Sequence, residues 1–274
     1  MTSIPKSIIN NEKLIWNLGR DDFKKKFAGS YLGIIWAFVQ PIVTILVYWF
    51  VFDKALNAGT QVTKSGIQAP YVLWLTAGMV PWFFFSDAVS SGTNALLEYS
   101  FLVKKVVFNI EILPTVKMMS SFFVHLFFIG FTLVFFTAYG YIPSIYAVQM
   151  LYYSFCMFFL VAGIVYFTSA VVVFFRDLSQ IVGIVLQILV WMTPIMWNID
   201  GMISQGRISN PVQIILKLNP MYYIVSGYRD SLLNRIWFFE RGMINLYFWG
   251  VTIVLLLFGN WVFKRLQPHF ADIL

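Results

Sequence analysis

Charge is what this sequence has least of. Asp, Glu, Lys and Arg make up only 11% of its 274 residues, whereas they form about a quarter of an ordinary soluble domain. Apolar residues make up 59%, and the mean hydropathy is +0.76. The 19 basic and 12 acidic residues are too few and too clustered to coat a water-soluble globule. The scarcity of charge excludes a soluble protein and indicates that lipid is the solvent for much of the chain.

The residues that metal and nucleotide chemistry require are also missing. Cys156 is the single cysteine, so no internal disulfide can form, and the two histidines, His125 and His269, lie far apart in the sequence. No His-Glu-x-x-His motif and no paired cysteines supply a metal site. No Gly-x-x-x-x-Gly-Lys-Ser/Thr motif occurs, and its nearest approach, residues 63–65, lacks the second glycine. We therefore predict that the chain is not an enzyme on its own and binds no cofactor.

What the chain does contain is long runs without charge. The runs are 27–52, 65–86, 118–175, 178–199 and 242–263, with lengths of 26, 22, 58, 22 and 22 residues. A helix needs about 20 apolar residues to cross the hydrocarbon layer, so four runs fit one span each and the longest fits two. Its turn is predicted at 139–144, where glycine, proline and serine cluster. Helices are favoured over a barrel because strand-like alternation is weak.

These runs predict an all-α integral membrane protein with six transmembrane helices in a single domain. The spans are expected at 31–52, 70–93, 114–138, 147–175, 178–198 and 242–263. With a cytoplasmic N-terminus, 12 of the 19 basic residues fall on inner segments. This excess predicts that both termini are cytoplasmic. The net charge of +7 is explained by this topology rather than by nucleic-acid binding.

Three segments outside the spans are too apolar to be plain linkers. Residues 8–27 have apolar and charged positions at helical spacing and predict an amphipathic helix on the inner membrane surface. Residues 94–113 predict a short cytoplasmic helix that either packs on the bundle or receives a partner. Residues 200–241 predict short helices, broken at Asn219-Pro220, that either re-enter the outer leaflet or lie on its surface.

Few ionisable groups fall inside the predicted spans, and Asp87 and His125 are the two that could carry a charge there. We expect Asp87 to play a structural role at the cytoplasmic end of the second span, with hydroxyl partners on its own helix. We expect His125 to be a neutral imidazole satisfied within the bundle. An ion-coupled carrier or channel would place several carboxylates near the midplane, and a membrane-embedded transferase would need a carboxylate pair. Both are alternatives that the sequence disfavours.

Aromatic residues are abundant: 29 Phe, 14 Tyr and 10 Trp amount to 19% of the chain. Many of them suit packing and the membrane interface. Flat aromatic faces with a few amides could also hold sugar rings loosely along a wide path. The candidate path residues on the first and fifth spans are Trp36, Gln40, Tyr48, Trp191 and Trp197.

Several stretches, in a fixed order along the six spans, carry a resemblance to a known family. They are Arg20-Asp21-Asp22-Phe23-Lys24, Gly29-Ser30-Tyr31-Leu32-Gly33-Ile34-Ile35-Trp36, Pro41, Tyr48-Trp49-Phe50-Val51-Phe52, Asn219-Pro220 followed by Arg229, and Phe263-Lys264-Arg265-Leu266-Gln267-Pro268-His269-Phe270-Ala271-Asp272. In these stretches the chain resembles the membrane subunits of ABC-2 type exporters of lipid-linked polysaccharides, especially the wall teichoic acid exporter branch. It departs from that pattern at Lys26-Phe27, where many members have Arg-Tyr.

The resemblance implies a multi-pass protein of the bacterial plasma membrane. It implies a homodimer around a translocation path, working with two copies of a separate ATPase that bind ATP and magnesium. Segment 94–113 then becomes the coupling segment that docks on the ATPase. The expected contact residues are Glu98, Phe101, Lys104 and Lys105, with Arg176 and Asp177 as a second contact between spans four and five.

The cargo that the resemblance implies is a polymer on an undecaprenyl diphosphate carrier, flipped from the inner to the outer leaflet for cell-envelope assembly. Its anionic diphosphate predicts a basic opening at Lys24, Lys25 and Lys26. Wall teichoic acid is the expected polymer. Capsule, O-antigen, a drug or a lipid are alternatives that share the same scaffold.

Overall fold

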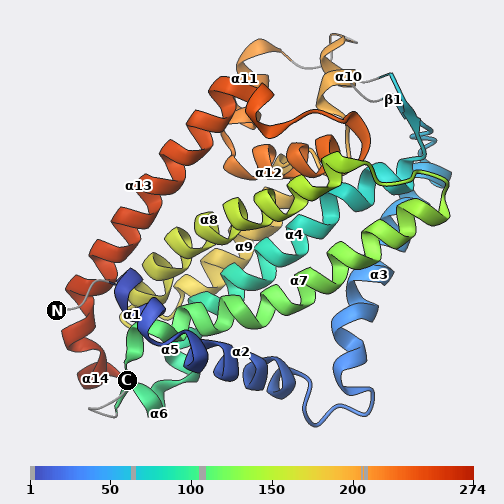
Figure 1. The fold of residues 1–274 in the computed structure, drawn as a ribbon. Coiled ribbons are helices and arrows are strands. Elements are labelled where there is room, and N and C mark those ends of the chain that lie inside the picture. Colours follow the sequence, from blue (N-terminus) through green and yellow to red (C-terminus); the bar gives the residue numbers. More distant parts are fainter. Residues whose placement is uncertain (1–3, 63–65, 105–108, 205, 207–208) are drawn as a thin grey trace.

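A computed structural model describes residues 4–62, 66–104, 109–204, 206 and 209–274, and almost all regular structure in them is helical (Figure 1). The all-α membrane fold predicted from the sequence is confirmed. The described strands form one short antiparallel pair, β1 (Gln61–Val62) and β2 (Gln68–Ala69). The α-helices are α1 (Ile4–Asn10), α2 (Glu12–Lys26), α3 (Trp36–Trp49), α4 (Tyr71–Thr93), α5 (Ala95–Glu98), α6 (Ser100–Val103), α7 (Leu113–Ala138), α8 (Gln149–Val172), α9 (Leu178–Met192), α10 (Ile199–Ser204), α11 (Asn210–Leu218), α12 (Pro220–Arg229), α13 (Gly242–Leu266) and α14 (Phe270–Ile273). Short 3-10 turns lie at Gly33–Ile35, Ile110–Ile112, Ile145–Val148, Phe238–Arg241 and Gln267–His269, and π-helical turns at Phe50–Ala55 and Asp230–Asn234.

Five helical stretches among the described residues are long and apolar enough to cross a membrane, which makes this a multi-pass membrane protein. They run over Gly33–Ala55, Tyr71–Thr93, Ile110–Ala138, Ile145–Val172 and Phe238–Ile273. Within the apolar window of α4 83% of the residues are buried, but only 11% in the window that contains α3. Helix α4 is therefore the centre of the bundle, in contact with α7, α8, α9 and α12, while α3 stands at its edge (Figure 1).

Helices α8 and α13 cross through glycine. A Cβ atom added to Gly259 on α13 would lie 2.4 Å from the carbonyl oxygen of Gly163 on α8, and one added to Gly163 would meet the backbone of Leu255 at 2.8 Å. Contacts this short exclude any side chain. Lipid gives helices no hydrophobic reason to associate, so close backbone approach between small residues supplies the packing that holds α13 on the bundle.

The fifth predicted span is shorter than expected. The sequence predicts a span over 178–198, but α9 ends at Met192. The cause is Pro194: the residue before a proline avoids the helical region, and Thr193 is extended with a ψ of 125°. A helix of 15 residues covers only about 22 Å of the roughly 30 Å of hydrocarbon. The remaining depth falls to the non-helical segment 193–198.

Non-helical backbone at membrane depth must find partners in the protein, and Arg229 supplies them here. Its two terminal nitrogens donate to the carbonyl oxygens of Pro194 and Ile195, each at 2.7 Å. Its guanidinium carbon lies 3.3 Å from the centroid of the Trp74 ring. The Tyr71 hydroxyl donates to the Met196 carbonyl at 2.6 Å. Helix α12, which begins at Pro220 with Asn219 as its N-cap, thus packs into the bundle and supports the non-helical segment that follows α9.

Both termini lie at one end of the bundle, together with α2, α5, α6 and α14 (Figure 1). We call this the inner end, because the distribution of basic residues predicts that it is cytoplasmic. Glu111 joins the two termini there: its carboxylate accepts from the Ser7 hydroxyl at 2.5 Å and pairs with Lys264 on α13. Strand β1 and helices α10 and α11 lie at the opposite, outer end (Figure 1).

Replacing Arg229 should remove the hydrogen bonds that support segment 193–198. We expect Arg229→Met to lower the free energy of unfolding by about 2–4 kcal/mol, because two buried carbonyls lose charged donors. Arg229→Lys should retain only part of that stability, since an ammonium lacks the planar guanidinium that donates to both carbonyls. Unfolding of the detergent-solubilised protein measures both. Arg235→Met is the matched control, because Arg235 is exposed. Equal losses at both positions would contradict this role for Arg229.

Candidate functional site

A cavity of about 380 Å³ opens between α2, α3, α4 and α7, with Leu186 of α9 at its side. Its inner end is polar, and the residues there are Lys26, Ser86, Asp87, Ser90 and Ser121. Farther along the same helices the lining becomes mainly apolar, with Pro41, Val80, Phe83, Phe84 and Phe128, and Gln40, Thr44 and His125 are the polar residues among them. The cavity is therefore amphipathic along the direction in which the helices cross the membrane.

The polar end is organised by an ion pair between α2 and α4. Lys26 Nζ lies 2.5 Å from Asp87 Oδ1, and both side chains are 39% exposed. The Ser121 hydroxyl of α7 donates to Asp87 Oδ2 at 2.7 Å. The Ser91 hydroxyl instead donates to the backbone carbonyl of Asp87, at 2.7 Å. The prediction that the Asp87 carboxylate finds hydroxyl partners on its own helix is wrong, because its partners come from α2 and α7.

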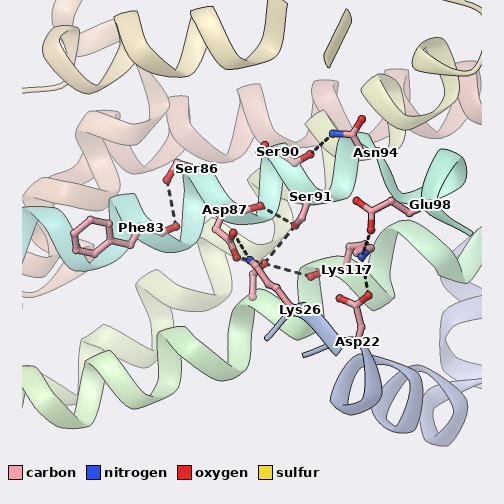
Figure 2. Close-up of polar contacts among 11 residues, drawn as sticks. Asp22, Lys26, Phe83, Ser86, Asp87, Ser90, Ser91, Asn94, Glu98 and Lys117 are labelled. Carbon is pink, nitrogen blue, oxygen red and sulfur yellow. Dashed lines mark hydrogen bonds and ion pairs between the residues drawn. The ribbon is translucent and has the colours of Figure 1, made fainter. Parts of the chain in front are cut away.

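A second, buried charge cluster lies one helical turn earlier on α2. Lys117 of α7 donates to Asp22 at 2.6 Å and to Glu98 of α5 at 2.5 Å. The Tyr99 hydroxyl also donates to Asp22, at 2.7 Å. The side chains of Lys117 and Asp22 are 9% and 8% exposed. Lys117 therefore holds α2 and the start of segment 94–113 to the same point on α7 (Figure 2).

Tyr99 is a fixed donor in this cluster. Burial, and next to it the hydrogen bond to Asp22, raises the pKa of its hydroxyl above the ordinary value. The hydroxyl therefore stays protonated and keeps donating to Asp22 throughout the physiological pH range.

A second hollow of about 350 Å³ runs past the cluster and shares Lys26 and Ser121 with the cavity.

The predicted coupling residues fall into three groups. Glu98 is half exposed, and its carboxylate faces inward to Lys117. Phe101 is 57% exposed, and Lys104, Arg176 and Asp177 are exposed at the inner end. Lys105 lies outside the described residues. The Ser179 hydroxyl donates to the Asn94 side chain at 2.6 Å, which brings the beginning of α9 beside the end of α4 and so places the two expected contact elements together.

The three predicted diphosphate lysines separate. Lys26 lines the cavity, and Lys25 lines the neighbouring hollow. Lys24 faces another side of α2, near Trp16 and Phe123. Consecutive residues of a helix point about 100° apart, which spreads the three lysines around α2, although Lys25 and Lys26 both line the neighbouring hollow.

The predicted path residues separate as well. Trp36 and Gln40 line the cavity with Lys26. Tyr48 is partly buried near Phe52, with ring centroids 6.5 Å apart. Trp191 lies in the last turn of α9 and Trp197 in the non-helical segment after it, and the Trp197 indole donates to the Trp191 carbonyl at 3.1 Å. The described structure therefore brings together one lysine, one tryptophan and one amide from the predicted set.

Asp22, Lys117 and Ser121 were not singled out by the sequence analysis. Two signals in the sequence could have identified Asp22 and Lys117. Asp22 and Lys26 are four residues apart on an amphipathic helix and therefore share a face. Lys117 is the last charge before the longest charge-free run, where a cation needs a partner.

His125 of α7 also lines the cavity. It is buried, and its Nε2 lies 2.9 Å from the Tyr228 hydroxyl of α12 and 3.1 Å from the Ser154 hydroxyl of α8. This hydrogen bonding joins three helices. Among the described residues, no group of three or more His, Cys, Asp or Glu side chains is placed to hold a metal ion.

Removing the shared cation should loosen the inner end. We expect Lys117→Met to lower the free energy of unfolding by about 2–4 kcal/mol, because Asp22 and Glu98 are left as unpaired neighbouring carboxylates. Denaturant unfolding in detergent measures it. The triple variant Lys117→Met, Asp22→Asn, Glu98→Gln should regain part of the loss, and Lys13→Met, at an exposed position of α2, should change little. A loss that the neutralised triple variant does not reduce would contradict the cluster.

Comparison with known proteins gives consistent matches over nearly the whole chain. The family model for ABC-2 type transporters matches residues 13–233. Two proteins of Klebsiella pneumoniae named O-antigen export system permease protein RfbA are 28% and 26% identical to the chain over 257 and 262 residues, each match covering 92% of both sequences. A protein of the same name from Myxococcus xanthus is 25% identical over 276 residues, covering 99% of both.

Proposed function

This chain belongs to the ABC-2 type transporter family, and on that basis we propose that it is the membrane subunit of an ATP-driven exporter of lipid-linked polysaccharide. As an ABC-2 permease component it carries no ATPase domain of its own, so the energy comes from a separate subunit that binds ATP and magnesium. The exporter contains two copies of each. It moves its cargo from the inner to the outer leaflet of the bacterial plasma membrane.

The names of the relatives favour an O-antigen-like polysaccharide as cargo. All three are named O-antigen export permeases, and they match this chain over nearly its full length. They support the alternative considered above rather than wall teichoic acid, the polymer expected from the resemblance. Both polymers present the same chemistry to the permease at one end, a lipid diphosphate.

The single observation that carries the proposal is the amphipathic cavity. Lys26 and the serine hydroxyls at its inner end suit an anionic phosphate. The apolar stretch beyond them suits a lipid chain, and Trp36 and Gln40 on α3 suit a sugar ring. A lipid that carries a phosphate-linked sugar joins these three chemistries in one molecule.

The inner end supports docking of the ATPase. Phe101 and Lys104 of the coupling segment, together with Arg176 and Asp177, are exposed there and free for a partner surface. Phe101 is a large apolar side chain outside the spans, which is typical of an interface. Glu98 takes a different role: through Lys117 and Asp22 it transmits displacement of the coupling segment to α2, whose Lys26 faces the cavity.

Two helices that the single chain leaves uncovered support a second copy beside them. Helix α9 buries no residue in the single chain, and α3 buries only Ala37 and Ile45. Both helices lie next to the cavity. A path formed between two copies would be lined by α3 and α9 from each.

The proposal is tested by transport in vesicles that hold this chain, its partner ATPase and fluorescent lipid-linked polysaccharide. Cargo that moves inward when ATP is added outside becomes protected from an added glycosidase. We expect Lys26→Ala to slow protection by about tenfold or more. Lys13→Ala, the same change at an exposed position of the same helix, should stay within about twofold. ATP-independent movement, or equal rates for both variants, would contradict the proposal.

A further inference from the structure

The donors around Asp87 form an anion site that is already occupied. Its carboxylate accepts two hydrogen bonds from other helices. The ammonium of Lys26 on α2 donates at 2.5 Å, and the hydroxyl of Ser121 on α7 donates at 2.7 Å. Ammonium and hydroxyl donors converging from different helices are also what a phosphate group requires. The carboxylate sits at the polar end of the cavity, where a phosphate of the proposed cargo would arrive.

The pair at this site can open, unlike the cluster beside it. The side chains of Lys26 and Asp87 are both 39% exposed. An ion pair that water reaches contributes little to stability, so exchanging its anion costs little. Lys117, by contrast, is 9% exposed and holds two carboxylates, so opening that pairing would leave a buried cation without a partner. Of these two lysines, Lys26 is therefore the one that can change anions.

A phosphate would compete favourably with the carboxylate for these donors. A diphosphate carries more negative charge than one carboxylate and presents more acceptor oxygens. Ser86 and Ser90 line the same end of the cavity and supply further hydroxyls within reach of such a group. A diphosphate that accepts from both Lys26 and Ser121 uses the donors that hold the Asp87 carboxylate, and the repulsion between the two anions then moves Asp87 away from Lys26.

Resting on the proposed function, we propose that Asp87 is the resident counter-anion of a phosphate subsite made by Lys26, Ser90 and Ser121. The diphosphate of the lipid-linked cargo displaces it on binding. The displaced carboxylate returns to Lys26 when the cargo moves on. This exchange keeps the empty cavity neutral and keeps the affinity low enough for release.

The exchange predicts an unusual gain on removing an acid. Asp87→Asn leaves a neutral amide of the same shape, which does not compete for Lys26. Binding of farnesyl diphosphate, measured calorimetrically on the full complex with its ATPase in nanodiscs of zwitterionic lipid, should become about tenfold tighter. Lys26→Gln should weaken binding, and adding Asp87→Asn to Lys26→Gln should give no gain. Asp21→Asn, an equal charge change at an exposed position of α2, should leave the affinity within about twofold.

Asp87→Glu serves as a second variant that keeps the charge, and it should show no gain. Inorganic pyrophosphate separates the two sources of a diphosphate. Equal gains for both probes in Asp87→Asn support the subsite, and a gain for pyrophosphate alone would overturn a lipid ligand. Unchanged or weaker binding of farnesyl diphosphate to Asp87→Asn, with binding still dependent on Lys26, would overturn the exchange and leave the proposed function standing. If the unaltered complex showed no ATP-driven transport of lipid-linked polysaccharide, the proposed function itself would fail.

Discussion

Burying a charge in lipid costs about 2.5–3.5 kcal/mol even by the mildest scales, and the arrangement of this protein depends on that cost. The described buried charges all have partners. Asp230 pairs with Arg241, Glu111 with Lys264, and Lys117 with Asp22 and Glu98. Arg229 has two backbone carbonyls and an aromatic face instead of a carboxylate. The pairs Glu111–Lys264 and Lys117–Asp22 join segments that are distant in sequence, so the few charges help to set how the apolar helices are assembled.

At the inner end the same constraint links the proposed binding site to the proposed coupling segment. Helix α2 carries Asp22 in the buried cluster and Lys26 in the cavity, four residues apart on one face. The buried cluster holds the coupling segment through Glu98, and the exposed pair holds the cavity through Asp87. A strong pairing fixes the helix, and a weak one leaves its lysine available. The difference in exposure between the two clusters is what allows one helix to serve both purposes.

The membrane requirement is local, and that is why the sequence predicts α4, α7, α8 and α13 well. A run of about 20 residues without charge has few other uses. The partners of Lys117 are not predictable in this way, because Asp22 lies 95 residues away and no period connects them. The end of α9 depends on Pro194, and a prediction made from the lengths of charge-free runs does not take proline into account. Of the predicted path tryptophans, Trp36 lines the described cavity and Trp191 and Trp197 do not, a division that composition cannot predict because aromatic residues suit both binding and the membrane interface.

The central claim is that a separate ATPase drives this chain from its inner end. The most direct measurement is the mass of the intact complex, purified gently from its native membrane, with its components identified by mass spectrometry. We predict a near-equimolar partner that carries the Gly-x-x-x-x-Gly-Lys-Ser/Thr motif absent here, in a complex of two copies of each chain. An oligomer of this chain alone, without an ATPase, would contradict the account.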